Sequence, residues 1–230
     1  MVSVIIPALN EAETIGTKIG EVIGHPDVRE VIVVDDGSDD RTAELAAAAG
    51  ARVIALTENG GKASALEAGV AAAVSELLLF MDADVTGYDH ALLSRIIDPV
   101  KAGRYEMFVG IRARRTYWLN RALRFFPIIG GERALTRELW ASVPKSHKQG
   151  FKIEVAMNYC AKRVGRGMGF ALIRGTRHHT KERKYGLLVG LFRRAGMMRE
   201  VVAISVRLYI LGNFTRNRRQ KKPGGTCQDV

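Results

Sequence analysis

The sequence predicts an α/β fold in which helices flank a mostly parallel sheet. Over residues 1–81, short β-branched or apolar runs alternate with stretches of helical periodicity, and such βαβ alternation makes successive strands parallel. Polar clusters follow directly after these runs, which is typical of loops at the carboxyl edge of a parallel sheet. The 230 residues, 47% of them hydrophobic, suffice to bury the core of one such domain.

The first half accounts for four strands and three helices. The apolar run at residues 2–6 ends at Pro7, and the stretch at residues 11–23 gathers its isoleucines on one helical face. A second helix is expected at residues 38–49, where Gly50 ends it. The other strands are expected at residues 31–34, 52–56 and 77–81, and the third helix at residues 62–74.

The second half has fewer regular patterns. We expect a strand at residues 105–109, a helix at residues 155–164 and a further strand at residues 170–173. Residues 117–126 mix aromatic side chains with two arginines. These patterns do not predict how the strands and helices of the second half are arranged.

Charge is distributed unevenly along the chain. Residues 1–111 contain 8 Lys/Arg and 18 Asp/Glu, a net charge of −10, whereas residues 112–230 contain 27 and 6, a net charge of +21. An acidic half suits a metal ion, and a basic half suits phosphates, nucleic acid or an anionic membrane, or is simply a solvated surface. We expect no nucleic-acid partner, because the first half is acidic and no recognisable basic–aromatic module is present.

Asp82-Ala83-Asp84 is the most informative motif, because it follows the strand expected at residues 77–81. Residues two apart on a strand point to the same face, so both carboxylates can grip a divalent cation. Alone, this motif is also explained by solvated turn residues. Its position strengthens the metal interpretation, because the three preceding strands also end in polar clusters, at residues 7–11, 35–38 and 59–62.

These motifs, in this order, resemble those of family-2 glycosyltransferases with the GT-A fold. The resemblance rests on Val4-Ile-Ile-Pro-Ala-Leu-Asn-Glu, Val33-Val-Asp-Asp-Gly-Ser, Gly61-Lys62 and Asp82-Ala-Asp, and covers roughly residues 2–110. It implies a GT-A-like sheet, a nucleotide-diphosphate sugar donor with UDP favoured, and Mg²⁺ or Mn²⁺ as cofactor. A nucleotidyltransferase is the alternative of another class, but it would need a glycine-rich loop after the first strand, where residues 7–11 have none.

The same resemblance implies roles for individual residues. The base and ribose are expected at Pro7, Leu9 and Asp36, with Glu11 at the same pocket. Lys62 is expected near the base or diphosphate. Asp82 is expected to approach the ribose or sugar and to belong to the catalytic set, and Asp84 is expected to bind the metal.

Three segments of the second half look similar to acceptor-side motifs of polyprenyl-phosphate sugar transferases and glucosyl-3-phosphoglycerate synthases. They are Gly131-Glu-Arg-Ala-Leu, Gly150-Phe-Lys-Ile-Glu and Gly175-Thr-Arg-His-His. The first adds Arg133 to the expected catalytic set. The second adds Glu154 to the same set: it accepts a proton from an acceptor hydroxyl or hydrogen-bonds that hydroxyl, or it only begins a helix. In the third, His179 is the best match to a metal-binding histidine, and His178 is the neighbouring option.

The C-terminal pattern suggests contact with a membrane. Residues 185–211 form a long apolar pattern broken by charges, among which Arg193, Glu200 and Arg207 recur every seven residues as a narrow polar stripe. A basic tail follows at residues 216–230. Charges interrupt every window long enough to span a bilayer. The pattern fits a helix lying in a membrane interface, and equally one that packs on the sheet or on a second copy in a homodimer.

Together these features predict three parts: a nucleotide-sugar-binding half at residues 1–110, an acceptor-binding half of the same domain at residues 111–184, and a C-terminal amphipathic helical extension with a basic tail at residues 185–230. The reaction is displacement at the anomeric carbon of the sugar, expected to be a hexose. The family resemblance favours inversion, and the synthase-like motifs leave retention open. We expect a polyprenyl phosphate or other membrane lipid as acceptor, with a small soluble phosphorylated acceptor such as phosphoglycerate as the alternative. With no basic leader region at the N-terminus, a cytoplasmic location at the inner face of the membrane is expected.

Overall fold

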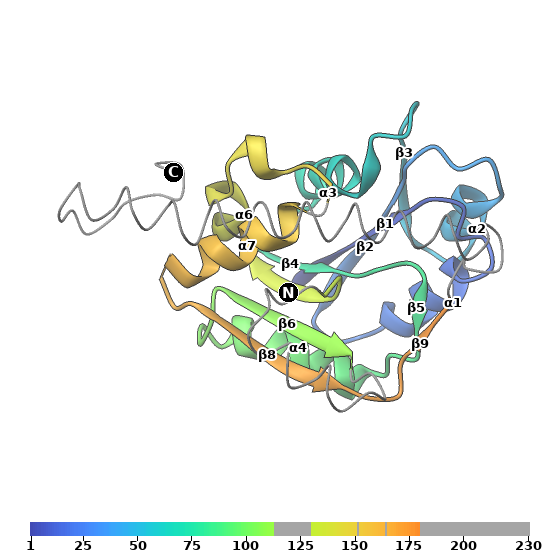
Figure 1. Ribbon diagram of the computed structural model, residues 1–230. Helices are drawn as coiled ribbons and strands as arrows, with labels where there is room; N and C mark the ends of the chain where they lie inside the picture. Colours follow the sequence, from blue (N-terminus) through green and yellow to red (C-terminus); the bar gives the residue numbers. More distant parts are fainter. Residues whose placement is uncertain (113–129, 151, 164, 180–230) are drawn as a thin grey trace, which may run out of the picture.

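A computed structural model describes residues 1–112, 130–150, 152–163 and 165–179. The described part contains a seven-stranded sheet with helices on both faces and a separate two-stranded sheet (Figure 1). The strands are β1 (Val2–Ala8), β2 (Val28–Asp35), β3 (Arg52–Ala55), β4 (Leu77–Phe80), β5 (Val85–Thr86), β6 (Met107–Arg112), β7 (Arg133–Thr136), β8 (Met168–Ile173) and β9 (Arg177–His178). The helices are α1 (Ile15–Val22), α2 (Thr42–Ala48), α3 (Gly61–Ala72), α4 (His90–Lys101), α6 (Arg137–Ser142) and α7 (Lys152–Arg163), with a 3₁₀ turn η1 (Lys145–His147).

The large sheet is mostly parallel, as the sequence predicts. Its strand order is β3-β2-β1-β4-β7-β6-β8, and β7 alone runs antiparallel to its two neighbours. Because β7 lies between β4 and β6, the second half of the chain completes the sheet that the first half begins. The predicted division at residue 110 falls within β6, so the two halves share one sheet.

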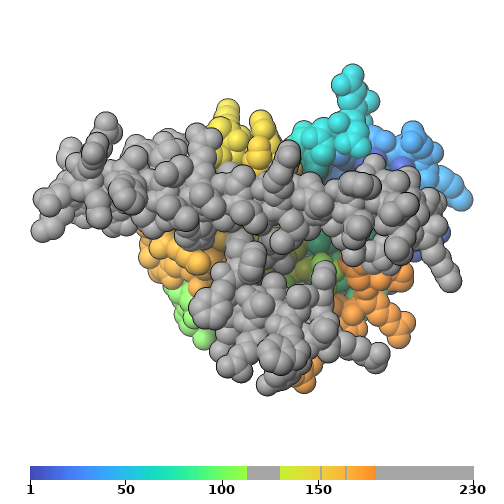
Figure 2. Space-filling model, viewed as in Figure 1, coloured from blue at the N-terminus to red at the C-terminus, as the bar shows by residue number. Residues whose placement is uncertain are grey.

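Each face of the sheet has its own core. On one face, β-strand side chains pack with α3, α6 and α7, and on the other face they pack with α1, α2 and α4. The ion pair between Lys148 and Glu67 joins the loop after α6 to α3, and Figure 2 shows these yellow and cyan segments side by side at one edge. A residue at a strand end can therefore face either the α7 side or the α1 side, and this distinction organises the site.

The first helix is shorter than expected and begins at Ile15 instead of residue 11. The backbone N–H groups of Asn10, Glu11 and Ala12 donate to side chains of residues 38–42, at 2.9, 2.8 and 3.2 Å, instead of opening a helix. Those partners lie 28 to 31 residues away in the chain. The periodicity of residues 11–23 could not reveal them.

Pro7 does not end the first strand, contrary to the prediction, because β1 continues to Ala8. The Ile5 carbonyl accepts from Met81 and the Ala8 carbonyl accepts from Asp36, so alternate residues of β1 bond toward β4 and β2. Pro7 shares the β4-facing side with Ile5, and the pairing with β4 stops at Ile5–Phe80. A proline is tolerated there because its missing N–H has no strand to bond.

Some elements were not predicted, and some predictions lie outside the described residues. The helix α4 was not predicted, although Asp89 caps it by accepting from the Leu92 N–H at 2.7 Å, which is a sequence-visible signal. Strands β5, β7 and β9 and helix α6 were also not predicted. The aromatic stretch at residues 117–126, the amphipathic pattern at 185–211 and the tail at 216–230 lie outside the described residues. Within the described ranges, no helix is long and apolar enough to cross a membrane.

Candidate active site

The polar clusters after β1 and β2 meet at the carboxyl edge of the sheet. Asn10 is the one described non-glycine residue with a positive φ, of 54°. Its side-chain oxygen accepts from the Asp39 N–H at 2.9 Å, and its own backbone N–H donates to the Ser38 hydroxyl at 2.9 Å. Asparagine tolerates this left-handed conformation better than most residues. The two loops are thereby fixed to each other beside Pro7, Leu9 and Glu11, where the sequence predicts the nucleotide. Glu11 accepts from the Thr14 hydroxyl at 3.1 Å. The contacts of these three residues with a base or ribose stay a prediction.

Asp36 links this edge to the start of α3. It is buried, and its two carboxylate oxygens accept the N–H groups of Gly60 and Gly61 at 2.9 and 2.8 Å. A carboxylate at a helix N-terminus is stabilised by the unpaired N–H groups there. Because Lys62 directly follows Gly61, Asp36 sets the position of Lys62. This role does not depend on a contact between Asp36 and a nucleotide.

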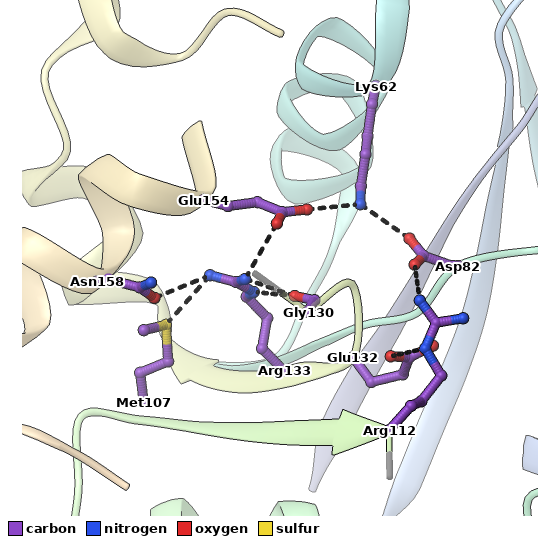
Figure 3. Close-up of polar contacts among 9 residues, drawn as sticks. All are labelled: Lys62, Asp82, Met107, Arg112, Gly130, Glu132, Arg133, Glu154 and Asn158. Carbon is purple, nitrogen blue, oxygen red and sulfur yellow. Dashed lines mark hydrogen bonds and ion pairs between the residues drawn. The ribbon is translucent and has the colours of Figure 1, made fainter. Parts of the chain in front are cut away.

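Lys62 lies between two carboxylates that are distant in the sequence. Its Nζ donates to Asp82 Oδ1 at 2.8 Å and to Glu154 Oε1 at 3.0 Å (Figure 3). Burial opposes its charge, but the two carboxylates together raise the pKa of Lys62 above its usual value. In the same way, burial disfavours a charged Asp82, yet Lys62 holds the pKa of that carboxyl below its usual range. Lys62 and Asp82 are thus both ionised at neutral pH.

Arg133 forms an ion pair with Glu154. It is 1% exposed, its Nε donates to the Gly130 carbonyl at 3.0 Å, and its Nη2 lies 3.7 Å from Glu154 Oε2. Asn158, on α7, accepts from Arg133 at 3.4 Å. The structure thus brings together Lys62, Asp82, Glu154 and Arg133, which the sequence assigned separately. Arg133 is deeply buried, and among the described residues the carboxylate that it approaches is Glu154. Its predicted catalytic role stays a prediction.

On its other side, Asp82 faces two residues that the sequence did not single out. Arg112 Nη2 lies 3.9 Å from Asp82 Oδ2, and Arg112 Nε lies 4.0 Å from Glu132 Oε2 (Figure 3). Neither distance is that of a hydrogen bond. Arg112 is one-quarter exposed, so its guanidinium can turn toward an anion at this edge. Arg112 is the last residue of β6, so the rule that site residues lie at strand ends, which pointed to Asp36, Lys62 and Asp82, could also have pointed to Arg112.

Behind Asp82, on the α1 face, lies a second group of polar residues. Lys18 and Glu132 are fully buried and Tyr88 is 4% exposed, and the Lys18 ammonium lies 4.1 Å from the centre of the Tyr88 ring. Among the described residues, the Lys18 ammonium, the Tyr88 hydroxyl and both Glu132 oxygens have no hydrogen-bond partner. Burial lowers the pKa of Lys18 to about 8, and burial together with Asp82 raises that of Glu132. The signal for Lys18 is its position three residues after Ile15, on the apolar face of α1.

Asp84 lies next to both candidate histidines. The His178 Nε2 is 3.2 Å from Asp84 Oδ2, whereas the His179 N–H donates to the Asp84 carbonyl and its ring contacts Thr86 Oγ1 at 3.0 Å. This arrangement follows from the pairing of β5 with β9, in which Val85 is opposite His178. The predicted role of His179 is untested, but the side chain beside the Asp84 carboxylate is that of its neighbour.

The donor set at Asp84 fits a metal that shares its coordination with a ligand. In the part of the chain that the structure describes, no three His, Cys, Asp or Glu side chains converge on one point. Mg²⁺ is typically held by one or two carboxylates together with substrate phosphates and water, and imidazole is a suitable ligand for softer divalent ions. A carboxylate with one imidazole therefore suits a metal that arrives with a diphosphate better than a closed protein site.

The glycosyl transferase family 2 model matches residues 3–124. The chain belongs to this family. Over 193 residues, it is 33% identical to a glucosyl-3-phosphoglycerate synthase of Mycolicibacterium paratuberculosis, with coverage of 68% of this chain and 58% of the relative. Over 134 residues, it is 36% identical to an undecaprenyl-phosphate 4-deoxy-4-formamido-L-arabinose transferase of Pectobacterium atrosepticum, with coverage of 53% and 40%. The chain thus spans less than two thirds of the length of these curated relatives.

A solved structure confirms the expected fold. The crystal structure of glucosyl-3-phosphoglycerate synthase from Mycobacterium tuberculosis in complex with Mn²⁺, UDP and glucosyl-3-phosphoglycerate superposes with a TM-score of 0.73 at 27% identity. The match covers 91% of this chain and 80% of that chain. The mostly parallel sheet with helices on both faces is therefore the GT-A arrangement that the motifs implied.

Proposed function

We propose that this protein transfers a sugar, expected to be a hexose, from a nucleotide-diphosphate sugar to a phosphate-bearing acceptor, with Mg²⁺ or Mn²⁺ as cofactor. The observation that carries this proposal is the meeting of two groups at one sheet edge. One is Asp84 beside a histidine, and the other is the Lys62 ammonium between Asp82 and Glu154. A uridine donor is favoured, because the similar synthase binds UDP with Mn²⁺.

In the proposed reaction, an acceptor oxygen forms a bond to the anomeric carbon while the bond from that carbon to the diphosphate breaks. A bound divalent ion supplies stabilisation of the negative charge on the departing diphosphate. Lys62 adds a fixed positive charge at the same edge, and it orients Asp82 to accept a hydrogen bond from a ribose or sugar hydroxyl. When the attacking oxygen belongs to a phosphate it arrives already ionised, so Glu154 takes no proton and can instead bind a hydroxyl group. When the attacking oxygen belongs to a hydroxyl, as in a phosphorylated hydroxy acid, its proton leaves as the bond forms, and Glu154 is the carboxylate at this edge that can accept it.

The metal site has a direct test in nucleotide binding. Asp84→Ala should weaken the Mn²⁺-dependent binding of UDP by about 10-fold or more, the scale expected when a coordination shell is damaged. Titration calorimetry with and without Mn²⁺ measures this. Asp98→Ala, at an exposed position on α4, is the matched control. Unchanged metal dependence in Asp84→Ala would remove Asp84 from the site. The same titration with His178→Ala and His179→Ala shows which imidazole takes part.

Among acceptors, we place a polyprenyl phosphate first, which would bring the protein to the inner face of the membrane. The support is the net charge of +21 in residues 112–230, more than a nucleotide donor needs. Near an anionic surface each Lys or Arg contributes on the order of 1 kcal/mol, and salt screens this attraction. We expect binding to anionic liposomes at low salt, a loss at high salt, and a further loss when residues 213–230 are deleted. Full-length protein that ignores anionic liposomes at low salt would contradict the membrane proposal.

A small phosphorylated hydroxy acid is the second candidate acceptor. It is supported by the likeness to glucosyl-3-phosphoglycerate synthase, which extends over more of the chain than the likeness to the lipid-phosphate relative. The two candidates separate in one assay with radiolabelled UDP-glucose and Mn²⁺. Transfer to a short-chain polyprenyl phosphate yields a product that partitions into organic solvent, whereas transfer to 3-phosphoglycerate leaves the label in water.

A further inference from the structure

Gly131 lies where the loop before β7 passes Asp82, and the carboxylate fills the space that a side chain would need. A Cβ atom placed on Gly131 would fall well under 3.0 Å from the Asp82 Cγ and from both of its oxygens. Two heavy atoms that are not covalently bonded to each other do not approach so closely. Any residue other than glycine at this position must displace the loop or the carboxylate.

Backbone conformation does not explain this glycine. Ten described glycines have a positive φ, and Gly131 is not one of them. An alanine at position 131 would therefore meet no backbone strain of the kind that glycine relieves. The three heavy atoms nearest to such a Cβ all belong to the Asp82 carboxylate, which makes the substitution a probe of that contact.

The contact between Gly131 and Asp82 involves the carboxylate that lies between Lys62 and Arg112. Asp82 Oδ1 accepts from Lys62 at 2.8 Å, and Oδ2 lies 3.9 Å from Arg112. The χ2 angle of an aspartate is broad and roughly two-fold, so one hydrogen bond does not fix the plane of the carboxylate. The carboxylate occupies the space where a Cβ on Gly131 would lie, and the next two residues, Glu132 and Arg133, lie 4.0 Å from Arg112 and 3.7 Å from Glu154. One loop thus touches three members of the charged network in succession.

We propose that Gly131 is a positioning residue of the transfer site: its missing side chain lets the loop before β7 press on the Asp82 carboxylate and hold it against Lys62. The catalytic consequence rests on the proposed function. The contact itself does not, because it can be measured in the stability of the protein. Loss of the contact should lower turnover of bound substrate more than it lowers donor affinity, since Asp82 would remain present but misdirected.

A double-mutant cycle tests the proposal with four proteins: the unaltered chain, Gly131→Ala, Asp82→Ala and the two combined. Thermal unfolding and donor turnover are measured for each. Gly131→Ala alone should lower the Tm by on the order of 5 °C, as expected for overpacking in a protein of this size. It should also lower kcat about 10-fold or more with a smaller change in KM. In the Asp82→Ala background the added methyl has room, so both effects should largely disappear.

Gly20→Ala is the matched control, because an added Cβ on that residue of α1 has no heavy atom within 4 Å among the described residues. It should leave kcat unchanged. An equal fall in Tm in both Asp82 backgrounds would overturn the contact, and an unchanged kcat in an active Gly131→Ala protein would overturn the positioning role. If Gly131→Ala does not fold, recovery of folding in the combined variant supports the contact, and continued failure overturns it. No turnover of any UDP-sugar by the unaltered chain would instead count against the proposed function, and the Tm cycle would still decide the contact.

Discussion

At the carboxyl edge of the sheet, the charged residues on the α7 face and those on the α1 face differ in how well they are hydrogen-bonded. On the α7 face, Lys62 has carboxylate oxygens at 2.8 and 3.0 Å, and Arg133 donates to a backbone carbonyl at 3.0 Å. On the α1 face, the one carboxylate oxygen within 4.0 Å of the Lys18 ammonium in the described chain belongs to Glu21, at 3.9 Å. No described residue meets the geometry of a hydrogen bond with Lys18 Nζ, the Tyr88 hydroxyl or the Glu132 carboxylate, although Glu132 is close enough to Tyr88 to help raise the pKa of that hydroxyl.

The hydrogen-bonded charges of the α7 face can contact a substrate directly, whereas the unpaired groups of the α1 face can influence it only through their electric field. Hydrogen-bonded charges hold a fixed geometry, as a preorganised site requires. A buried polar group without a partner costs roughly 1–3 kcal/mol, so the α1 group lowers stability unless water enters. Lys18 interacts favourably through space with Glu132 and Glu21 first, and also with Asp82 and Asp84. We infer that its positive charge offsets their mutual repulsion from behind, at the expense of stability.

The largest expected effect comes from breaking the paired face. Lys62→Met should lower kcat about 100-fold or more, because it removes a fixed charge beside the departing diphosphate and leaves Asp82 and Glu154 facing each other. Lys148→Met is the matched control, since Lys148 also pairs with a glutamate but lies at the edge of α3 away from Asp82. Steady-state kinetics with a UDP-sugar measures both. Similar losses in the two variants would mean that Lys62 only supports the fold.

The same variant should also change how stability depends on pH. Lys62 lowers the folded-state pKa of Asp82, so the pair contributes stability above the unfolded value near 3.9 and loses it as pH falls through the folded value. The stability difference between the unaltered chain and Lys62→Met should therefore be greatest near neutral pH and shrink below about pH 4. Urea unfolding at pH 7 and at pH 3.5 tests this. A difference that grows on acidification would show that Asp82 and Lys62 are not paired in solution.

Much of the fold and part of the site could be predicted from sequence because those features are local. The β-branched runs gave the first four strands within a few residues, and the strand-end rule placed Asp36, Lys62, Asp82 and Asp84 at one edge. What could not be predicted depends on contacts between distant segments. The short start of α1 is fixed by the loop after β2, and the insertion of β7 between β4 and β6 depends on the packing of the second half.

The α1-face residues show a second limit of sequence reasoning. Lys18 interrupts an apolar helical face, which usually means a charged end reaching solvent from the edge of the face. Only the structure shows that it is fully buried and faces Tyr88. Glu132 was quoted within a motif, but only the structure shows that it is fully buried, 4.0 Å from Arg112.

A moderate effect is expected from Lys18→Met, which keeps the length of the side chain and removes the buried charge. The folded-state pKa of Lys18, about 8, lies below the unfolded value near 10.5, so the unfolded chain binds more protons between these values and the unaltered protein gains stability as pH rises through them. Lys18→Met should therefore be more stable by about 1–3 kcal/mol below pH 8, with the gain shrinking toward pH 10.5. Thermal unfolding from pH 7 to pH 10 measures this. A variant that is destabilised at pH 7 would show that Lys18 is paired.

The smallest effect is expected from Tyr88→Phe, which removes one hydroxyl from the α1 face and leaves the ring under the Lys18 ammonium. That hydroxyl is buried and has no described hydrogen-bond partner, and burial together with the nearby Glu132 raises the pKa of Tyr88 above its usual value, so it stays neutral. Removing a bare hydroxyl deletes an uncompensated desolvation penalty, whereas the cation–π contact survives in phenylalanine. The free energy of unfolding should change by less than about 1 kcal/mol, in the stabilising direction if at all. Urea unfolding at pH 7 is sufficient to measure it, with Lys18→Met and the double variant completing a cycle. A loss of about 2 kcal/mol or more would mean that the hydroxyl donates to Glu132 or to a buried water, and the α1 face would then contain a hydrogen-bonded pair, as the α7 face does.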